Sequence, residues 1–229
     1  MKQRILIHCS VLMIIITISS CTKDNSLKSN KNDVSGYGYF PINVGHYVIY
    51  NVDSIVYNPN LQYQRDTFHY KLKELIESTY IDNSGNLTER IERYVWDETN
   101  FVWNINNVWT SNRKQQDAEK VEDNVRYVKL AFPVKLNSTW NGNALNSLYP
   151  EWDYSYTQVD VPAKVATLSF DSTLTVLQLA DSNFVYNHYA IEQYAKNVGM
   201  IYKELKYITD STIGKVGLDL KMTIESYNK

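Results

Sequence analysis

The sequence predicts a single all-β domain of about ten or eleven antiparallel strands, forming a curved sheet, half-barrel, barrel or sandwich. Apolar and polar side chains alternate over many short segments, which is typical of strands with one wet face. The 19 tyrosines outnumber the 8 glycines and 5 prolines together, and five tryptophans join them. Aromatic residues of this kind favour pleated, half-buried surfaces. No stretch offers an amphipathic helix of three turns.

The first twenty residues predict a signal peptide that is cleaved. Lys2 and Arg4 precede an apolar run from Ile5 to Ile18, and Ser19 and Ser20 follow it. This order of charged, apolar and small residues is that of a secretory signal. The apolar run of about 14 residues is shorter than the ~20 that a membrane-spanning helix needs.

Cys21 ends this segment and is predicted to carry lipid. The residues Ile18-Ser19-Ser20-Cys21 resemble a bacterial lipobox, in which the cysteine becomes acylated and N-terminal after cleavage. The resemblance implies an outer membrane lipoprotein, because two or three acyl chains such as palmitate hold a protein at a membrane essentially permanently. Cys9 leaves with the signal, so the mature chain has no intrachain disulfide.

The next residues predict a tether. Residues 21–36 comprise the lipidated cysteine and a polar segment too poor in apolar side chains to fold, and residues 37–229 form the β domain. Lys23-Asp24 resembles the signals that send Bacteroidetes lipoproteins to the cell surface, so both the periplasmic face and the surface stay open. Cleavage leaves 21 basic residues (23 less Lys2 and Arg4) against 25 acidic ones, which excludes nucleic acid as the main partner.

The expected strands follow in order from residue 46. In the clearest run, residues 68–81, Phe68, Tyr70, Leu72, Ile76 and Tyr80 share one face. The segment Asp82-Asn83-Ser84-Gly85-Asn86 then predicts a hairpin loop; it also resembles an oxygen-rich calcium loop but lacks the spaced acids. The other predicted strands lie at residues 46–57, 87–97, 101–109, 125–132, 152–159, 164–170, 173–180, 184–195, 200–209 and 217–226.

Two further segments of the sequence have patterns of their own. Residues 101–109 place Phe101, Trp103, Ile105 and Trp109 on one side of a strand. Residues 113–124 contain only Ala118 and Val121 as apolar side chains, so they predict a long solvated loop or a short surface helix.

Four blocks of the domain resemble recurring segments of Bacteroidetes lipoproteins whose activity is not established. They include Tyr-Phe-Pro, Phe-Pro, Trp-Asn-Gly-Asn and Tyr-Ala-Lys-Asn-Val-Gly motifs and lie at residues 39–52, 130–143, 170–179 and 189–204. The resemblance covers nearly all of residues 38–205. It implies a single all-β domain and supplies no catalytic residue.

No metal, cofactor or catalytic motif is predicted. The mature chain keeps His46, His69 and His188, with no cysteine pair and no His-Glu-x-x-His spacing. No nucleophile elbow or phosphate loop is present. Glu89 could face Glu151 or Asp153 across a cleft, as glycoside hydrolysis requires, although spacing alone does not place them. The sequence thus favours a protein that is not an enzyme.

The tryptophans give the best binding hypothesis. Trp140, Trp103, Trp109 and Trp152 could line a concave face as platforms for a glycan or as walls for an acyl chain. The alternative is that they fill the core. Trp140 stands out because the polar, small residues around it predict a loop, where binding residues are frequent.

Three serines could be modified. Asp53-Ser54-Ile55, Asp171-Ser172-Thr173 and Asp210-Ser211-Thr212 resemble the sites at which exported Bacteroidetes proteins are O-glycosylated. Asp-Ser pairs are also common at strand ends.

The sequence therefore predicts a lipid-anchored envelope protein with a binding or scaffolding role toward a glycan, a lipid or a partner protein. A glycan-acting hydrolase with a carboxylate pair is one alternative. The other is a structural subunit of a surface assembly, in which a sheet edge pairs with a neighbour.

Overall fold

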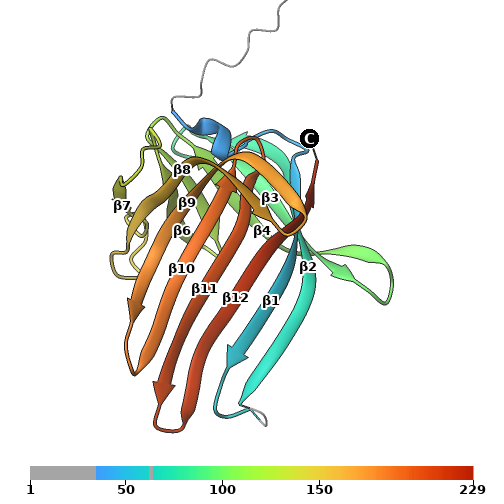
Figure 1. Cartoon of the computed structure of the whole chain (residues 1–229). Helices are drawn as coiled ribbons and strands as arrows, with labels where there is room; N and C mark the ends of the chain where they lie inside the picture. The colour runs from blue at the N-terminus through green and yellow to red at the C-terminus, as the bar shows by residue number, and fades with distance from the viewer. Residues whose placement is uncertain (1–34, 62–63, 229) are drawn as a thin grey trace, which may run out of the picture. The chain divides into compact units, whose positions relative to one another are not determined.

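One antiparallel sheet of twelve strands contains nearly all of the chain that the computed structural model describes, residues 35–61 and 64–228 (Figure 1). The predicted signal peptide, Cys21 and most of the predicted tether lie outside the described residues. The all-β prediction is confirmed, with slightly more strands than the ten or eleven expected. Within the described residues, no helix is long and apolar enough to cross a membrane.

The strands and the short 3-10 helix at the start of the described chain have the following bounds: η1 (Tyr37–Tyr39), β1 (Tyr47–Tyr57), β2 (Arg65–Ile81), β3 (Leu87–Asp97), β4 (Val102–Arg113), β5 (Asp117–Glu122), β6 (Val125–Ala131), β7 (Thr139–Asn141), β8 (Asp153–Val165), β9 (Leu168–Ser182), β10 (Tyr186–Ala195), β11 (Gly199–Ser211) and β12 (Gly214–Tyr227).

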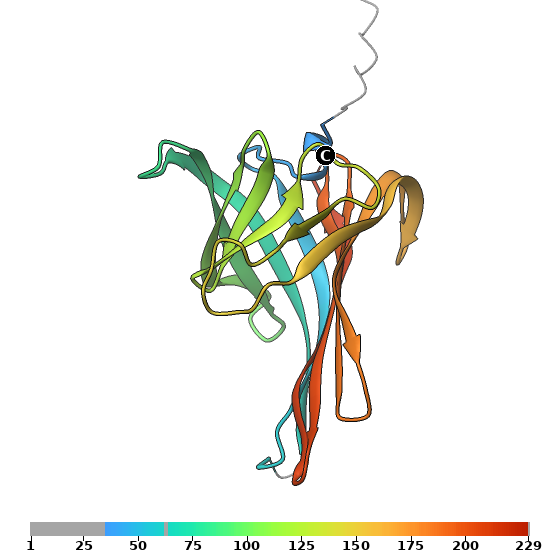
Figure 2. The ribbon, with the colours of Figure 1, turned by 90° about the vertical axis from the view of Figure 1, so that its left-hand side faces the viewer.

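The sheet is a meander whose first and last strands meet in its middle. Its order is β6-β5-β4-β3-β2-β1-β12-β11-β10-β9-β8-β7, and every neighbouring pair is antiparallel. Figure 2 shows the sheet curling so that β5 and β6 approach the region of β7 and β8. The lower ends of the central strands extend beyond this curled part (Figures 1 and 2).

Isolated contacts, rather than a continuous ladder, join the two edges of the sheet. The Val128 amide of β6 donates to the carbonyl of Gly142 at 2.9 Å, just after β7. The Tyr156 hydroxyl of β8 donates to the Ala131 carbonyl at 2.8 Å and accepts from the Ala131 amide at 2.9 Å. A tyrosine hydroxyl thus satisfies backbone groups at the edge that would otherwise lack partners.

Three of the sequence motifs that suggested a family resemblance converge near η1. The Asn197 amide donates to the Gly38 carbonyl at 2.7 Å, and Pro41 lies against Gly199. The Tyr37 ring packs edge-on against Phe132, with centroids 4.8 Å apart. These contacts bury a core cluster containing the residues Tyr39, Phe40, Phe132, Tyr154, Tyr156, Leu174, Val176 and Tyr194. A second cluster is built mainly from β1, β11 and β12, with single buried residues from β2, β8, β9 and β10.

Three local predictions were wrong, two of a loop and one of a strand. Residues 113–124 contain β5 instead of a solvated loop, because ion pairs of Glu119 and Lys120 allow these charged side chains to be buried. Trp140 lies in the three-residue strand β7 instead of a loop. The run 164–170 is not a separate strand, since it spans the turn between β8 and β9.

A bulge accounts for a fourth difference. The pairing of β3 with β4 shifts register between Arg93 and Tyr94, and a one-residue slip moves side chains to the opposite face. Ile105 is consequently 54% exposed, and Phe101 lies in the turn at 74% exposure. The hairpin loop at Asp82–Asn86 is confirmed, because the Asp82 carboxylate accepts from the amides of Ser84 and Asn86 at 2.9 and 2.8 Å.

Candidate functional site

A cavity of about 410 Å³ lies among strands from both arms of the curled sheet. It is lined by aromatic residues, two lysines, one glutamate and one glutamine, contributed by β5, β6, β8, β9, β11, β12 and the segment between β7 and β8. A pocket of this size, with aromatic walls and a few convergent polar groups, is the usual form of a small-molecule site.

A row of six rings, which we term the aromatic ladder, begins in the wall of this cavity, and the first four of them line it. Successive centroids are 6.4, 6.3, 6.3, 3.8 and 4.5 Å apart in the order Tyr127, Tyr149, Trp152, Tyr207, His188 and Tyr186. Tyr149 and Tyr207 are 48% and 44% exposed, so both rings are partly accessible to solvent although each also contacts neighbouring rings. Accessible aromatic surface can contact flat apolar surfaces of a ligand.

Asparagines hold the segment that carries Tyr149 and Trp152. The Asn143 amide nitrogen donates to the Pro150 carbonyl at 2.7 Å, and Asn146 donates to the Arg126 carbonyl at 2.9 Å. The Gly142 amide donates to the Trp152 carbonyl at 2.9 Å. Hydrogen bonds from within the Trp-Asn-Gly-Asn motif and from Asn146 therefore fix two rings of the ladder.

Gly142 is also required by the close approach of Tyr154, another residue of the cavity wall. A Cβ atom at position 142 would lie 2.3 Å from the Tyr154 ring, well inside van der Waals contact. Only glycine lets this ring lie flat against the backbone there.

A buried group of four charges, three of which line the cavity, forms and supports its floor. The Lys129 ammonium lies 2.5 Å from Glu192 Oε1 and 3.2 Å from Glu122 Oε1. The Lys203 ammonium makes longer contacts, 3.3 Å to Glu192 and 3.4 Å to Glu122. The Lys203 side chain is 15% exposed, compared with 4% for Lys129, and both line the cavity.

These four groups stay charged at neutral pH. Burial alone would raise the pKa of Glu122 and of Glu192, but the two neighbouring lysines outweigh it and hold both values below normal. The carboxylates in turn raise the pKa of Lys129 and Lys203 despite burial. Burial raises the pKa of Tyr127 to about 12, so its hydroxyl stays a neutral donor.

A second charged group, beside the first, lies against a smaller cavity of about 70 Å³. Glu74 accepts from Arg93 at 2.9 Å and from Lys120 at 2.7 Å, and all three side chains are 11% exposed. Trp109 covers this group, with the Arg93 guanidinium 3.5 Å and the Lys120 ammonium 5.0 Å from its ring. Glu122 and Lys129 line both cavities, so the two charged groups form one ionic network.

Two buried nitrogen atoms near the large cavity lack a hydrogen-bond partner. Gln178 lines the cavity and is 5% exposed, and its amide nitrogen has no acceptor. His188 Nε2, in the ring between Tyr207 and Tyr186 of the aromatic ladder, also has none. An unpaired buried polar atom is costly, so native proteins keep few of them, and Gln178 carries one in the cavity wall.

The structure separates the four tryptophans suggested as binding residues. Trp152 belongs to the aromatic ladder, and Trp109 covers the Glu74 group. Trp140 packs on Tyr154 and Tyr156 and donates to the Val128 carbonyl at 2.9 Å. Trp103 pairs with Trp96 at 5.2 Å, next to the exposed tip of the β3–β4 hairpin. Only Trp152 among these four lines the large cavity.

The carboxylates suggested for hydrolysis are not brought together in either cavity. Glu89 is 1% exposed on β3, where it accepts from the Ser111 hydroxyl at 2.8 Å. Glu151 and Asp153 are exposed at the start of β8. None of these three residues lines the two cavities described above.

The floor glutamates are also poor acid–base candidates. Glu122 and Glu192 have their pKa values lowered together by the same lysines. Acid–base catalysis by two carboxyls needs environments that push the two values apart. Glu122 and Glu192 therefore lack the separated pKa values of an acid–base carboxylate pair.

The three serines suggested for glycosylation differ in exposure. Ser54 is 8% exposed within β1, and the Ser172 hydroxyl donates to Asp160 at 2.8 Å. Ser211 is exposed and donates to the Gly214 carbonyl at 2.5 Å. Ser211 is therefore the most accessible of the three.

None of the floor residues was among the predicted site residues, although a signal exists for two of them. Lys203 and Glu192 are polar residues at inward positions of alternating strands. Lys203 lies between Ile201 and Leu205, and Glu192 between Ala190 and Tyr194. A charge on the apolar face of a strand indicates a buried partner.

Comparisons with known proteins found two solved structures with some likeness to the chain. A protein assigned as exported, with a YmcC-like fold, from Bacteroides fragilis is 12% identical, with a TM-score of 0.44. A protein assigned as a lipoprotein from Parabacteroides distasonis is 10% identical, with a TM-score of 0.32. Each alignment covers 83% of this chain and 98% of the other.

No protein-family model matches the sequence, and no curated protein matches it. At these TM-scores neither structural likeness supports a function, so we base the function on the residues of the cavity.

Proposed function

We propose that this protein is a lipid-anchored envelope protein that binds a glycan in the large cavity, against the aromatic ladder. The observation that carries the proposal is the ladder itself, four of whose six rings line a cavity of about 410 Å³ that also has hydrogen-bonding groups in its wall. Sugars combine an apolar ring face with many hydroxyl groups. Stacked rings beside polar donors and acceptors match both features.

The floor favours a glycan over an acyl chain. An acyl chain filling the cavity would lie against Glu122, Lys129 and Lys203 and would separate these charges from polar surroundings. Burying charged groups against hydrocarbon is costly. A sugar hydroxyl can instead bond to them.

A purely structural role receives less support. Assembly through a sheet edge needs a long strand with free backbone groups. In the described chain, the edge strand β7 has three residues, and the other edge strand, β6, is bonded to Gly142 and Tyr156, so the longest remaining edge is that of β8 beyond its pairing with β7.

The binding test is a titration of the purified lipoprotein in detergent with a panel of oligosaccharides and fatty acids, followed by thermal shift and calorimetry. We expect a glycan to raise the melting temperature. Trp152→Ala should weaken that binding at least about tenfold, a loss equivalent to about 1.4 kcal/mol. Trp103→Ala is the matched control, because Trp103 lies away from the cavity, and it should leave the affinity unchanged.

Two results would overturn the proposal. One is binding of fatty acids without any glycan. The other is an equal loss of affinity in the two tryptophan variants, since that would place the ligand outside the cavity.

The lipid anchor is tested separately. The lipobox-like residues Ile18 to Cys21 support acylation of Cys21 and attachment to the outer membrane. In cells fed a labelled palmitate, the wild-type chain should incorporate label and sediment with membranes. Cys21→Ser should do neither, and a Cys21→Ser chain that stays labelled would contradict the anchor.

A further inference from the structure

Charged side chains line the large cavity: two lysines, Lys129 and Lys203, and one glutamate, Glu122. Glu192 pairs with both lysines, so the charges of this group balance. The neighbouring group has two cations, Arg93 and Lys120, for one carboxylate, Glu74, and none of these three lines the large cavity. The case for an anionic ligand therefore rests on the donors in the cavity wall.

The unpaired donor lies in the same wall. Gln178 is 5% exposed, lines the cavity, and has an amide nitrogen with no acceptor. Lys203 is the more exposed of the two floor lysines, and its contacts of 3.3 and 3.4 Å to glutamates are long for charge-assisted hydrogen bonds. Both side chains can therefore donate to a further acceptor.

The geometry points to an acidic glycan, whose sugar ring stacks on the aromatic ladder while its carboxylate accepts hydrogen bonds from Lys203 and Gln178. A carboxylate only accepts hydrogen bonds, which matches two donors in the wall. This inference rests on the proposed function and narrows it to uronic-acid-containing oligosaccharides. Recognition of this kind is selective, because a neutral ligand leaves the buried donors unpaired.

The experiment compares ligands that differ only in charge. The lipoprotein in detergent is titrated with hexamers of galacturonate and of glucuronate, each as the free acid and as the full methyl ester. We expect at least one free acid to bind about tenfold or more tightly than its ester, as expected for pairing of buried donors.

Substitutions test which side chains cause the preference for acid over ester. Gln178→Leu removes the donor at similar size and should abolish most of the preference for acid over ester while leaving ester binding unchanged. Gln193→Leu, on the neighbouring strand β10, is the matched control, because Gln193 does not line the cavity. Lys203→Met should act like Gln178→Leu, and its melting curve shows whether it folds. Trp152→Ala should weaken acid and ester alike.

The outcomes separate the two proposals. Equal affinity for acid and ester, with Trp152 still required, overturns the acidic preference and leaves glycan binding intact. Binding of neutral glycans with no binding of either acid has the same consequence. If no glycan of either kind binds, the proposed function itself fails. A preference for acid that survives in Gln178→Leu and in folded Lys203→Met also overturns the assignment.

Discussion

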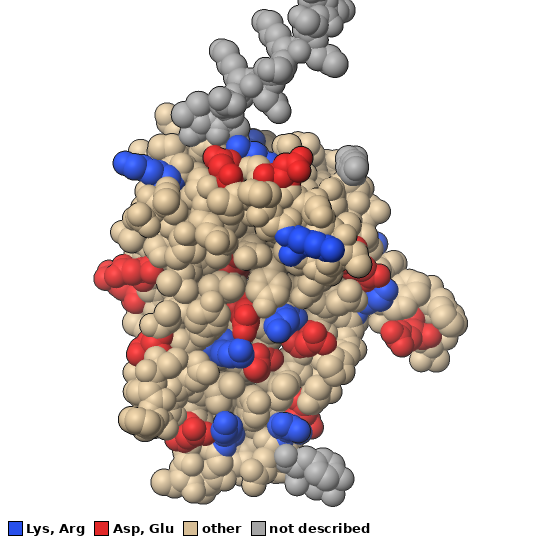
Figure 3. Space-filling model, in the orientation of Figure 1, with Lys and Arg blue, Asp and Glu red and all other residues tan. Residues whose placement is uncertain are grey.

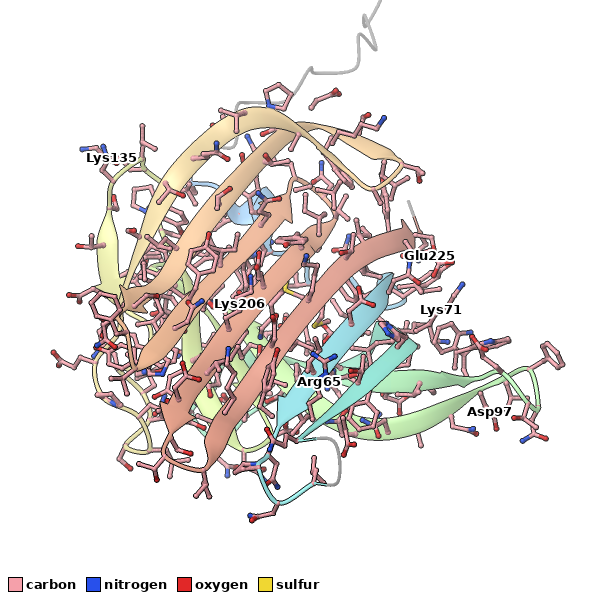
Figure 4. The ribbon with its side chains drawn as sticks, turned by 60° about the horizontal axis from the view of Figure 1, so that its bottom comes forward. Arg65, Lys71, Asp97, Lys135, Lys206 and Glu225 are labelled. Carbon is pink, nitrogen blue, oxygen red and sulfur yellow. The ribbon has the colours of Figure 1, made fainter. Side chains whose placement is uncertain are left out.

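Ion pairs occur on both faces of the sheet at similar distances, but in different surroundings. Inside, Lys129 lies 2.5 Å from Glu192, with side-chain exposures of 4% and 0%. Outside, Lys71 lies 2.6 Å from Glu225 with exposures of 40% and 34%, and Figure 4 shows this pair at one side of the sheet. The space-filling view shows positive and negative side chains interspersed across that face (Figure 3).

Connectivity distinguishes the two faces further. Glu192 accepts from Lys129, Lys203 and the Tyr194 hydroxyl, so both of its oxygens are satisfied. Lys71 and Glu225 form an isolated pair that water can replace. Distance alone therefore does not set the contribution of an ion pair. Burial and the number of shared partners determine what its loss costs.

The largest expected effect follows from removing one inner charge. Glu192→Gln leaves Lys129 and Lys203 sharing only Glu122, so a buried cation loses its partner. We expect the free energy of unfolding to fall by about 3–5 kcal/mol. Urea denaturation at pH 7 measures this. A loss below about 1 kcal/mol would show that the inner network behaves like surface pairs.

The next largest expected effect is a dependence of the free energy of unfolding on pH that arises from Glu89. Burial raises the pKa of Glu89 from 4.5 to about 7, although the Ser111 hydroxyl donates to one oxygen. The folded state therefore holds a proton that the unfolded state releases between about pH 4.5 and 7. Its stabilising contribution is complete below about pH 4.5 and is lost as the pH rises through 7, by about 3 kcal/mol at most.

The measurement is the free energy of unfolding from pH 4 to pH 8. Glu89→Gln, which mimics the protonated carboxyl, should remove this part of the pH dependence and be more stable than wild type at pH 8. A variant with the wild-type pH profile would show that Glu89 is charged in the folded protein. Glu89→Gln should leave glycan binding unchanged, because Glu89 does not line the cavities.

A substitution at Gly217, which lines the large cavity, should lower the stability by a smaller amount. Gly217 has φ of +136°, and a Cβ atom there would lie 1.9 Å from the Tyr207 carbonyl oxygen. Gly217→Ala should push β12 from β11 and destabilise the protein by about 1–3 kcal/mol. Gly85→Ala is the control, because Gly85 also has positive φ but open space around it. Thermal unfolding should show a larger loss for position 217, and equal losses would show that strain without the clash suffices.

Sequence patterns predicted the fold better than the site. Alternation of apolar and polar residues over 68–81, followed by the Asp82–Asn86 loop, indicated β2 and its hairpin. The pattern is informative because successive side chains on a strand point to opposite faces of the sheet. The same rule missed β5, where the inward residues include Lys120. Bulges such as that between Arg93 and Tyr94 also cannot be found from alternation, since one extra residue inverts the pattern.

The site depends on pairings between distant segments. Lys129 and Glu192 are 63 residues apart, and their contact follows from how the sheet curls after its strands have formed. Trp152 was among the predicted binding residues, yet Tyr149 and Tyr207 complete the ladder only in three dimensions. A composition rich in tyrosine predicts aromatic contacts. It does not say which rings stack on one another.

The smallest expected effect lies on the outer face and serves as the reference for the others. Lys71→Ala removes the 2.6 Å pair with Glu225, but both side chains are partly exposed, at 40% and 34%, so water can reach the pair although Glu225 Oε2 is itself buried. We expect a loss below about 1 kcal/mol that shrinks further in 0.5 M salt, roughly three times physiological ionic strength, because salt screens exposed charges. The cost of Glu192→Gln should change little under the same conditions, because its partners are shielded from mobile ions. Equal salt sensitivity of the two variants in urea denaturation would contradict the distinction between the two faces.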